Sequence, residues 1–125
     1  MALPIVYVDV SEIRDGKLEE LEQAMNHLVQ FVKANMARII SYGFFIDPKQ
    51  TTMTVVAIHP DAASLEFHLD EGRDEFRKFA HLIDLSRIEV YGSVTEAVVE
   101  RLQRKARMLG RGNVAVHDLF AGFSR

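Results

Sequence analysis

The stretch ARIISYGFFIDPKQTTMTVVAIH, residues 37–59, predicts the fold more clearly than any other part of the chain. Two runs rich in β-branched and aromatic residues, 37–46 and 51–59, flank the segment DPKQ. Pro48 presets the second position of a tight turn, so the two runs are expected to form a β-hairpin. Both runs carry apolar residues on both sides, which predicts a sheet with both faces covered.

The flanking segments add two helices and two strands. Residues 4–13 alternate as a half-buried strand does, whereas apolar positions from 17 to about 36 recur at three- and four-residue steps, as in an amphipathic helix. Asp61 is a plausible N-cap for a second helix that breaks near Gly72. Residues 87–93 alternate again and are expected to form the fourth strand.

The last third of the chain predicts one more helix and an apolar tail. Ser93-Val94-Thr95-Glu96 fits a capping box, and helical spacing then continues to Gly110. The tail 114–123 is too apolar to stay exposed on a monomer, so it is expected to dock on the body or on a partner subunit.

The order β-α-β-β-α-β is that of a ferredoxin-like α+β domain, in which two helices cover one face of an antiparallel four-stranded sheet. The length of 125 residues and 48% hydrophobic content predict a single domain, 1–125. Its core would span about 4–92, and 93–125 would add the extra helix and tail. Because the strands look apolar on both sides, the bare face is expected to meet a second copy, giving a homodimeric α+β barrel.

Composition excludes several classes of partner. The net charge of −3 argues against nucleic acid, and the cluster Arg101, Arg104, Lys105, Arg107 and Arg111 is interpreted as a solvated helix face. With no cysteine, disulfides and thiolate chemistry are ruled out. No signal peptide or membrane span is recognisable, which predicts a cytoplasmic protein without a membrane partner.

The spacing of chemically active residues argues against metal and nucleotide cofactors. No two histidines have the i, i+4 spacing of a helical metal pair, and the glycines are too scattered for a phosphate-binding loop. None of the serines at 41, 64 and 86 lies in a G-x-S-x-G turn, which sets aside that hydrolase class.

His68 is the strongest single candidate for a functional residue. Its spacing with Leu65 and Leu69 points it at the apolar side of the second helix, where it would be either a hydrogen-bonded core histidine or a ligand contact. Tyr42 and Tyr91 lie on strands that could border the same helix–sheet cavity.

A second candidate group lies on the first strand. Tyr7 and Asp9 share one face of it, and a buried Asp9 would need a partner such as Arg87 or His59. An ion pair there would be either structural or catalytic. His59 itself, next to Pro60, looks peripheral.

From Val6 to Gly92, the sequence resembles the dimeric α+β barrel proteins and, among them, the antibiotic-biosynthesis-monooxygenase-like domains. The resemblance rests on the element order and on the segments YGFF (42–45), TVVAI (54–58), SLEFHL (64–69) and FRKF (76–79). Members include cofactor-free oxygenases of polyketide-type aromatics and haem-degrading enzymes. The haem-degrading members use a Trp, and this chain has none.

The resemblance implies a small aromatic ligand between helices and sheet, with no cofactor. His68 would be the base, Tyr42 or Tyr91 would orient the ligand, and further contacts would come from Tyr7, Asp9, Phe76 and Arg87. Two alternatives stay open: a non-catalytic dimer that binds a metabolite or another protein, and a haem-binding relative without degradation.

Overall fold

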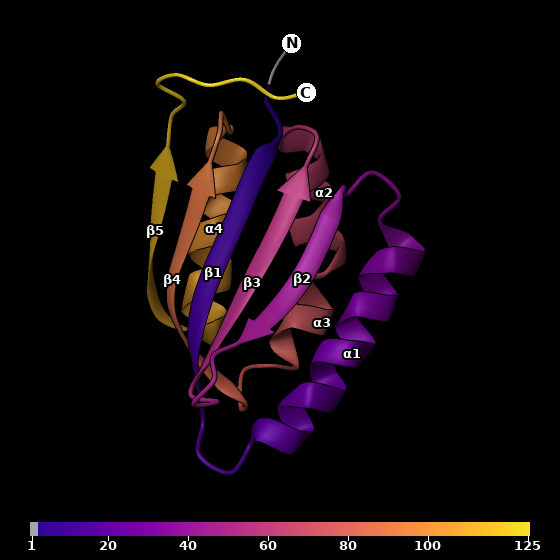
Figure 1. Cartoon of the computed structure of the whole chain (residues 1–125), viewed down its shortest axis with the longest axis vertical. Helices are drawn as coiled ribbons and strands as arrows, with labels where there is room; N and C mark the ends of the chain where they lie inside the picture. The colour runs from indigo at the N-terminus through magenta and orange to yellow at the C-terminus, as the bar shows by residue number, and fades with distance from the viewer. Residues whose placement is uncertain (1–2) are drawn as a thin grey trace.

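A computed structural model describes residues 3–125, so the first two residues of the predicted domain lie outside it. It shows one five-stranded sheet in the order β2-β3-β1-β4-β5, with helices packed on one face (Figure 1). The elements are, in chain order, β1 (Ile5–Ile13), α1 (Leu18–Asn35), β2 (Ser41–Ile46), β3 (Thr52–His59), α2 (Ala62–Glu71), α3 (Arg73–Arg77), β4 (Ile83–Tyr91), α4 (Glu96–Leu109) and β5 (Gly110–His117).

The predicted hairpin is present as β2 and β3, which pair antiparallel. Its turn is held by the Asp47 carboxylate, which accepts hydrogen bonds from the backbone N–H groups of Thr51 (2.8 Å) and Thr52 (2.7 Å). β1 lies between β3 and β4 and pairs antiparallel with both. The first four strands therefore have the arrangement expected of a ferredoxin-like unit.

The prediction of a purely antiparallel four-stranded sheet is wrong, because residues 110–117 form a fifth strand parallel to β4. A parallel neighbour requires a crossover, and α4 supplies it between β4 and β5. A Cβ atom at Gly110 would lie 2.5 Å from the carbonyl oxygen of Leu85, so glycine permits the close start of β5. The extra helix and part of the predicted tail thus form a β-α-β unit.

The hydrophobic core lies between the sheet and the helices. In Figure 1, α2, α3 and α4 lie behind the sheet, while α1 runs alongside β2. Alternate residues of β1 and β3 are buried against this layer, as are Leu21, Met25, Leu28 and Val32 of α1. None of the helices within residues 3–125 is long and apolar enough to span a bilayer.

The other face of the sheet is partly exposed in the single chain, and the expectation that a second copy covers it stays a prediction. Val6, Val8 and Val10 are partly exposed there, and Phe45 is 59% exposed. This bare face turns towards the viewer in Figure 1. The apolar residues on both sides of the strands therefore reflect one buried face and one partly exposed one.

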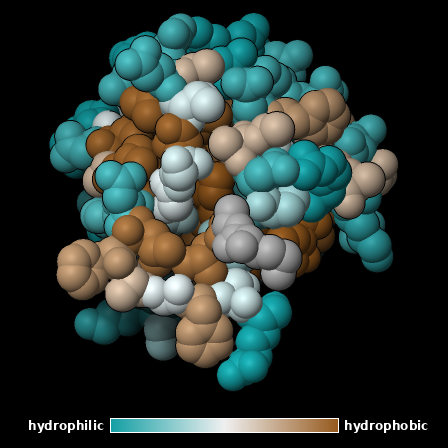
Figure 2. Space-filling view, turned by 90° about the horizontal axis from the view of Figure 1, so that it is seen from above, coloured by the Kyte–Doolittle hydropathy of each residue, from teal (hydrophilic) through white to brown (hydrophobic). Residues whose placement is uncertain are grey.

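The final segment, residues 118–125, crosses the end of the sheet near the N-terminus (Figure 1). The prediction that the tail docks is confirmed for β5, where Val114 packs against the core. Beyond β5, however, Leu119, Phe120 and Phe123 remain exposed. Figure 2 looks down on this end, where hydrophobic side chains gather in the middle of the view.

Some element boundaries differ from the sequence prediction. The break at Gly72 is present, since α2 ends before it and α3 begins after it. β4 begins at Ile83, four residues before the predicted 87. The cap of α4 is Thr95, not Ser93, because the Thr95 hydroxyl accepts a hydrogen bond from the backbone N–H of Val98.

Candidate functional site

The alternation of β1 directs two polar side chains into the helix-covered core. Tyr7 is fully buried and Asp9 is 2% exposed, between the apolar positions that a half-buried strand requires. The Tyr7 hydroxyl donates a hydrogen bond to Oδ2 of Asp9. Oδ1 of Asp9 is buried without a hydrogen-bond partner within residues 3–125. One carboxylate oxygen is therefore held, and the other is available to a ligand.

Lys105 on α4 completes a buried triad with these two residues. Its Nζ donates to the Tyr7 hydroxyl at 2.8 Å and lies 3.5 Å from Oδ2 of Asp9. The same ammonium lies 4.0 Å from the ring centroid of Phe76, within cation–π range. The three polar groups form a short hydrogen-bonded chain from lysine to phenol to carboxylate.

Burial and mutual attraction act in opposite directions on this triad. Burial raises the pKa of Asp9, and the attraction of Lys105 and the Tyr7 hydrogen bond only partly offset it. Burial likewise lowers the pKa of Lys105, against the effect of Asp9. Burial and the neighbouring Asp9 raise the pKa of Tyr7. A carboxyl and an ammonium whose pKa values move towards neutrality are suited to acid–base chemistry.

A layer of aromatic and imidazole rings lies beside the triad. The ring of His68 lies 5.3 Å from those of Tyr42 and His59 and 5.1 Å from that of Phe76, measured between centroids. His59 Nδ1 lies 2.9 Å from the Ser64 hydroxyl. Nε2 of both histidines is buried without a partner in the part of the chain that the structure describes.

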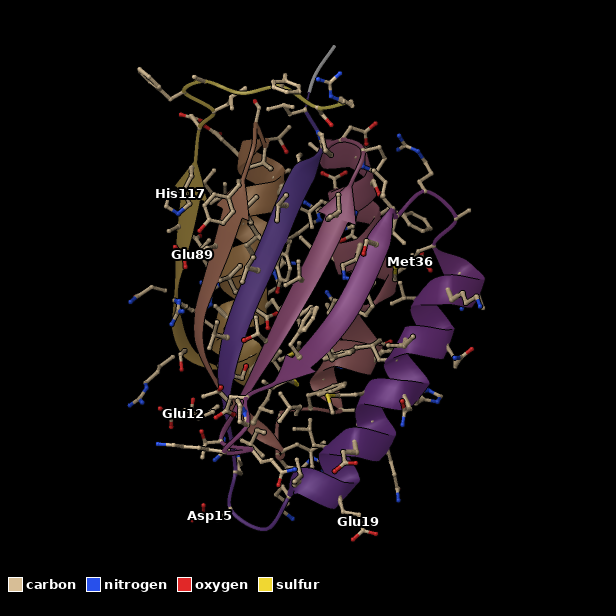
Figure 3. The ribbon with its side chains drawn as sticks, in the orientation of Figure 1. Glu12, Asp15, Glu19, Met36, Glu89 and His117 are labelled. Carbon is tan, nitrogen blue, oxygen red and sulfur yellow. The ribbon has the colours of Figure 1, made fainter. Side chains whose placement is uncertain are left out.

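Both histidines are held neutral. Burial is the main cause that lowers the pKa of His68 well below its ordinary value, and the nearby charge of Lys105 lowers it further. Burial also lowers the pKa of His59 to about 4. Nδ1 of His68 lies 2.9 Å from the sulfur of Met36, which Figure 3 labels at the end of α1. Because a thioether only accepts, this contact assigns the proton to Nδ1 and leaves a lone pair on Nε2.

A small cavity borders both groups. Its volume is about 20 Å³, enough for roughly one water molecule. The wall includes Asp9 and Lys105 of the triad, together with Tyr42, Phe44, Phe76 and Phe79. A polar corner in an otherwise apolar cavity is the usual form of a small-molecule site, although this one is closed to anything larger than water.

The structure brings together five of the seven residues predicted from sequence. Tyr7 contacts Asp9, and His68 lies against Tyr42 and Phe76. All five lie between the sheet and the helices: Tyr7, Asp9 and Tyr42 come from the strands, and His68 and Phe76 come from α2 and α3.

The other two lie on the bare face, so the expectation that Tyr91 shares the helix–sheet cavity is wrong. Tyr91 is 41% exposed and stacks on His117 with centroids 4.6 Å apart. Arg87 pairs with Glu89 at 3.2 Å rather than with Asp9. Figure 3 shows Glu89 and His117 side by side on β4 and β5. The residues of β4 alternate, and Ile88 and Val90 occupy the helix-covered positions.

Two further buried residues were misjudged. Lys105 is 7% exposed, not solvated, and it is the partner of Asp9. The sequence did indicate this burial, because position 105 follows the helical spacing of the buried positions 98, 102 and 109 and so lies on the apolar stripe of α4. His59 is fully buried rather than peripheral, because it ends β3 on the same face as Val55 and Ala57. Within residues 3–125, no three His, Asp or Glu side chains gather as metal ligands would.

Comparison with known proteins rests on structure alone, since no family model and no curated protein matches the sequence. MupZ from Pseudomonas fluorescens superposes with a TM-score of 0.76 at 21% identity, covering 100% of this chain and 91% of its own. A candidate antibiotic biosynthesis monooxygenase from Deinococcus radiodurans superposes with a TM-score of 0.61 at 16% identity, covering 71% of this chain and 91% of its own. A conserved protein from Methanosarcina mazei superposes with a TM-score of 0.64 at 20% identity, covering 72% of this chain and 92% of its own.

The chain shares its fold with these solved structures, and one of them is the candidate antibiotic biosynthesis monooxygenase. This likeness agrees with the resemblance drawn from sequence at the level of the single-chain α+β fold. The match to MupZ extends over the whole chain and so includes α4, which carries Lys105. The other two matches cover 71% and 72% of the chain. Because all identities are below a quarter, the comparison describes the fold and not the reaction.

Proposed function

We propose that the chain is a cofactor-independent monooxygenase that acts on an aromatic or polyketide-like small molecule, with Asp9 as the catalytic base. The observation that carries the proposal is the unpartnered Oδ1 of Asp9, buried at the wall of an apolar cavity beside a buried ammonium. An unpartnered buried carboxylate oxygen is costly, and a substrate proton would satisfy it.

In the proposed reaction Asp9 removes a proton from an activated CH₂ group, and Lys105 stabilises the resulting anion. The electron-rich carbanion reacts with O₂ to form a peroxide. Loss of water then yields the ketone, so that one CH₂ group and one O₂ become one C=O group and one H₂O. All four electrons that reduce O₂ come from the substrate carbon, which is why no redox cofactor is required.

His68 and Tyr42 serve in this proposal as positioning residues. The lowered pKa of His68 makes it a weak base, whereas the raised pKa of Asp9 makes that carboxylate a stronger one than usual. The free lone pair on Nε2 of His68 can still accept a hydrogen bond from a hydroxyl on the substrate. The ring layer around it offers flat surfaces for an aromatic ligand.

Substrate entry requires the cavity to open, because about 20 Å³ holds only a water molecule. Phe76 is the side chain best placed to move. It borders the cavity on one side and, on the other, a surface cleft of about 320 Å³. A rotation of this ring would connect the two spaces.

The proposal includes a homodimer formed through the bare face of the sheet. Val6, Val8 and Val10 on β1 lie beside the outward residues of β3 and form a partly exposed apolar strip. Covering this strip by the same strip of a second copy is the isologous contact that such a face favours.

A non-catalytic binding or protein-interaction dimer is the second candidate. The closed cavity favours it, because a buried triad that never meets a ligand would be a structural ion pair. The exposed Leu119, Phe120 and Phe123 favour it as well, since they offer apolar surface to a partner.

Oxygen uptake tests the two candidates against each other. Purified protein is mixed with a panel of anthrones and hydroxylated aromatics, and uptake is compared with that of the protein-free solution. Uptake above that rate is expected, and Asp9→Asn is expected to reduce kcat by at least about a hundredfold, the usual scale of general-base catalysis.

Asp84→Asn is the matched control, because it makes the same change on neighbouring β4 outside the triad. Thermal melting of both variants checks that they fold. Uptake that is unchanged in a folded Asp9→Asn variant would rule out Asp9 as the base. Uptake absent across the whole panel would favour the binding module.

A further inference from the structure

The surface cleft between the α2–α3 segment and α4 is lined mainly by cationic side chains, although the protein as a whole carries a net charge of −3. Its volume is about 320 Å³. The charged residues that line it are five cations and one carboxylate: Arg73, Arg77, Arg101, Arg104, Lys105 and Asp70. A concave surface with one sign of charge concentrates ions of the opposite sign.

Helical spacing places these side chains in two facing rows. Arg101, Arg104 and Lys105 are three and four residues apart, so they share one face of α4. Arg73 and Arg77 are likewise four residues apart at the two ends of α3. The solvated helix face expected from sequence is therefore one wall of a cleft.

The ion pairs within the cleft leave positive charge available. Arg101 is engaged by Asp70 at 2.7 Å, which accounts for the single carboxylate in the lining. Arg104 binds Glu100 at 2.7 Å, and Arg77 binds Asp74 at 3.3 Å. Each of these two pairs joins solvent-exposed side chains one helical turn apart, so it is weak and can be exchanged for a ligand. Arg73 has no ion-pair partner among residues 3–125.

The cleft shares a wall with the inner cavity. Phe76 and Lys105 border both spaces, and the Lys105 ammonium lies over the Phe76 ring. A molecule that reaches Asp9 past Phe76 would leave its other end among the arginines. Guanidinium groups bind carboxylates and phosphates through paired hydrogen bonds.

We propose that this cleft binds the anionic end, a carboxylate or a phosphate, of an otherwise apolar substrate whose reactive part lies beside Asp9. The inference rests on the function proposed above and narrows its substrate class to amphipathic anions. Arg73 and Arg104 make the contacts with the anion, and Phe76 separates the anionic end from the reactive part.

Binding of three ligands with the same alkyl chain tests the proposal by isothermal titration calorimetry. Nonanoate and octyl phosphate are expected to bind at least about tenfold more tightly than octan-1-ol, the scale of one charge-assisted contact. The double variant Arg73→Gln/Arg104→Gln is expected to abolish this preference and to leave the affinity for octan-1-ol unchanged. Preference for one anion over the other identifies the head group.

Arg111→Gln is the matched control, because Arg111 is an exposed arginine on β5 outside the cleft. Equal binding of octan-1-ol and the two anions, or an anion preference that survives in the double variant, would overturn the proposal. Asp9→Asn is expected to keep the preference while losing turnover. A failure of the proposed reaction therefore remains distinguishable from a failure of the anion site.

Discussion

The two faces of the sheet treat polar side chains in opposite ways. On the bare face, Arg87, Glu89 and His117 lie near the surface, and each has a partner. On the helix-covered face, four polar atoms are buried without a partner within residues 3–125, namely Asp9 Oδ1, Ser11 Oγ, His59 Nε2 and His68 Nε2. The bare face therefore has paired polar side chains, whereas unpaired polar atoms of β1, β3 and α2 lie in the interior on the other side.

This difference locates the functional site. Each unpartnered buried group costs of the order of 1–3 kcal/mol, and a core that served only stability would replace it with an apolar residue. Such costs concentrate where a ligand completes the hydrogen bonding. The predictions below compare substitutions on the covered face with matched ones on the bare face.

The largest effect is expected for Lys105→Met, which removes the charge and keeps an unbranched side chain. It leaves the buried Asp9 without its cation, so the free energy of unfolding should fall by about 3–5 kcal/mol. On the bare face Arg87→Met should change it by less than about 0.5 kcal/mol, because its pair is exposed. Urea unfolding monitored by circular dichroism measures both.

A double variant sharpens this first comparison. Asp9→Leu with Lys105→Met replaces the whole buried pair by apolar groups and should recover most of the lost stability, while all turnover disappears. If the double variant were as unstable as Lys105→Met, packing of the lysine stem rather than its charge would explain the loss.

The second effect is a dependence of stability on pH that comes from His59. Burial lowers its pKa to about 4 in the folded protein, below the ordinary 6.5. A histidine whose pKa is lowered by folding contributes to the free energy of unfolding. That contribution is fully present at pH values above the ordinary histidine pKa and is lost as pH falls towards 4. The full loss is about 3 kcal/mol.

This loss appears as the difference between the wild type and His59→Gln in urea unfolding at a series of pH values. Below the ordinary histidine pKa, the free energy of unfolding of the wild type should fall more steeply with decreasing pH than that of His59→Gln. Parallel curves for the wild type and His59→Gln would mean that water reaches His59.

The third effect concerns the ring that separates the two spaces. A Cβ at Gly72 would lie 2.4 Å from Cζ of Phe76, so Gly72→Ala should displace Phe76 and cost about 1–3 kcal/mol. On the bare face, a Cβ at Gly43 would meet only the edge of the exposed Phe45 ring at 3.3 Å. Gly43→Ala should therefore cost less in the same unfolding measurement.

The smallest effect on the single chain is expected from deleting residues 118–125. This segment is exposed, so its loss should change the free energy of unfolding by less than about 0.5 kcal/mol. Sedimentation measures whether Leu119, Phe120 and Phe123 contribute to the proposed dimer. A shift from dimer to monomer would show that these side chains contribute to the dimer interface. An unchanged dimer would show that the bare face alone forms this interface.

Strand and helix patterns predicted most of the fold but not its fifth strand. Alternation placed Tyr7 and Asp9 together, and helical spacing placed His68 towards the sheet. β5 escaped prediction because Gly110, Gly112 and Asn113 weaken the strand signal, and pairing with β4 overrides local propensity.

The central pair of the site was harder to predict, because it joins residues nearly a hundred positions apart. The sequence predicts that Asp9 would need a partner such as Arg87 or His59 if it were buried, but the apolar stripe of α4 that contains Lys105 was interpreted as a charged surface. A lysine on such a stripe has two explanations, an ammonium that reaches the surface or a buried partner for a carboxylate. Only the packing of α4 against β1 decides between them.

The central claim is that Asp9 is a buried carboxyl tuned for proton transfer rather than half of a structural ion pair. A pH titration of its side-chain carboxyl carbon by NMR tests this claim directly, with Asp84 as an internal reference. The account predicts a pKa for Asp9 above the ordinary aspartate value, because burial outweighs the attraction of Lys105. A pKa at or below that value would show that the ion pair dominates and would contradict the assignment of Asp9 as the base.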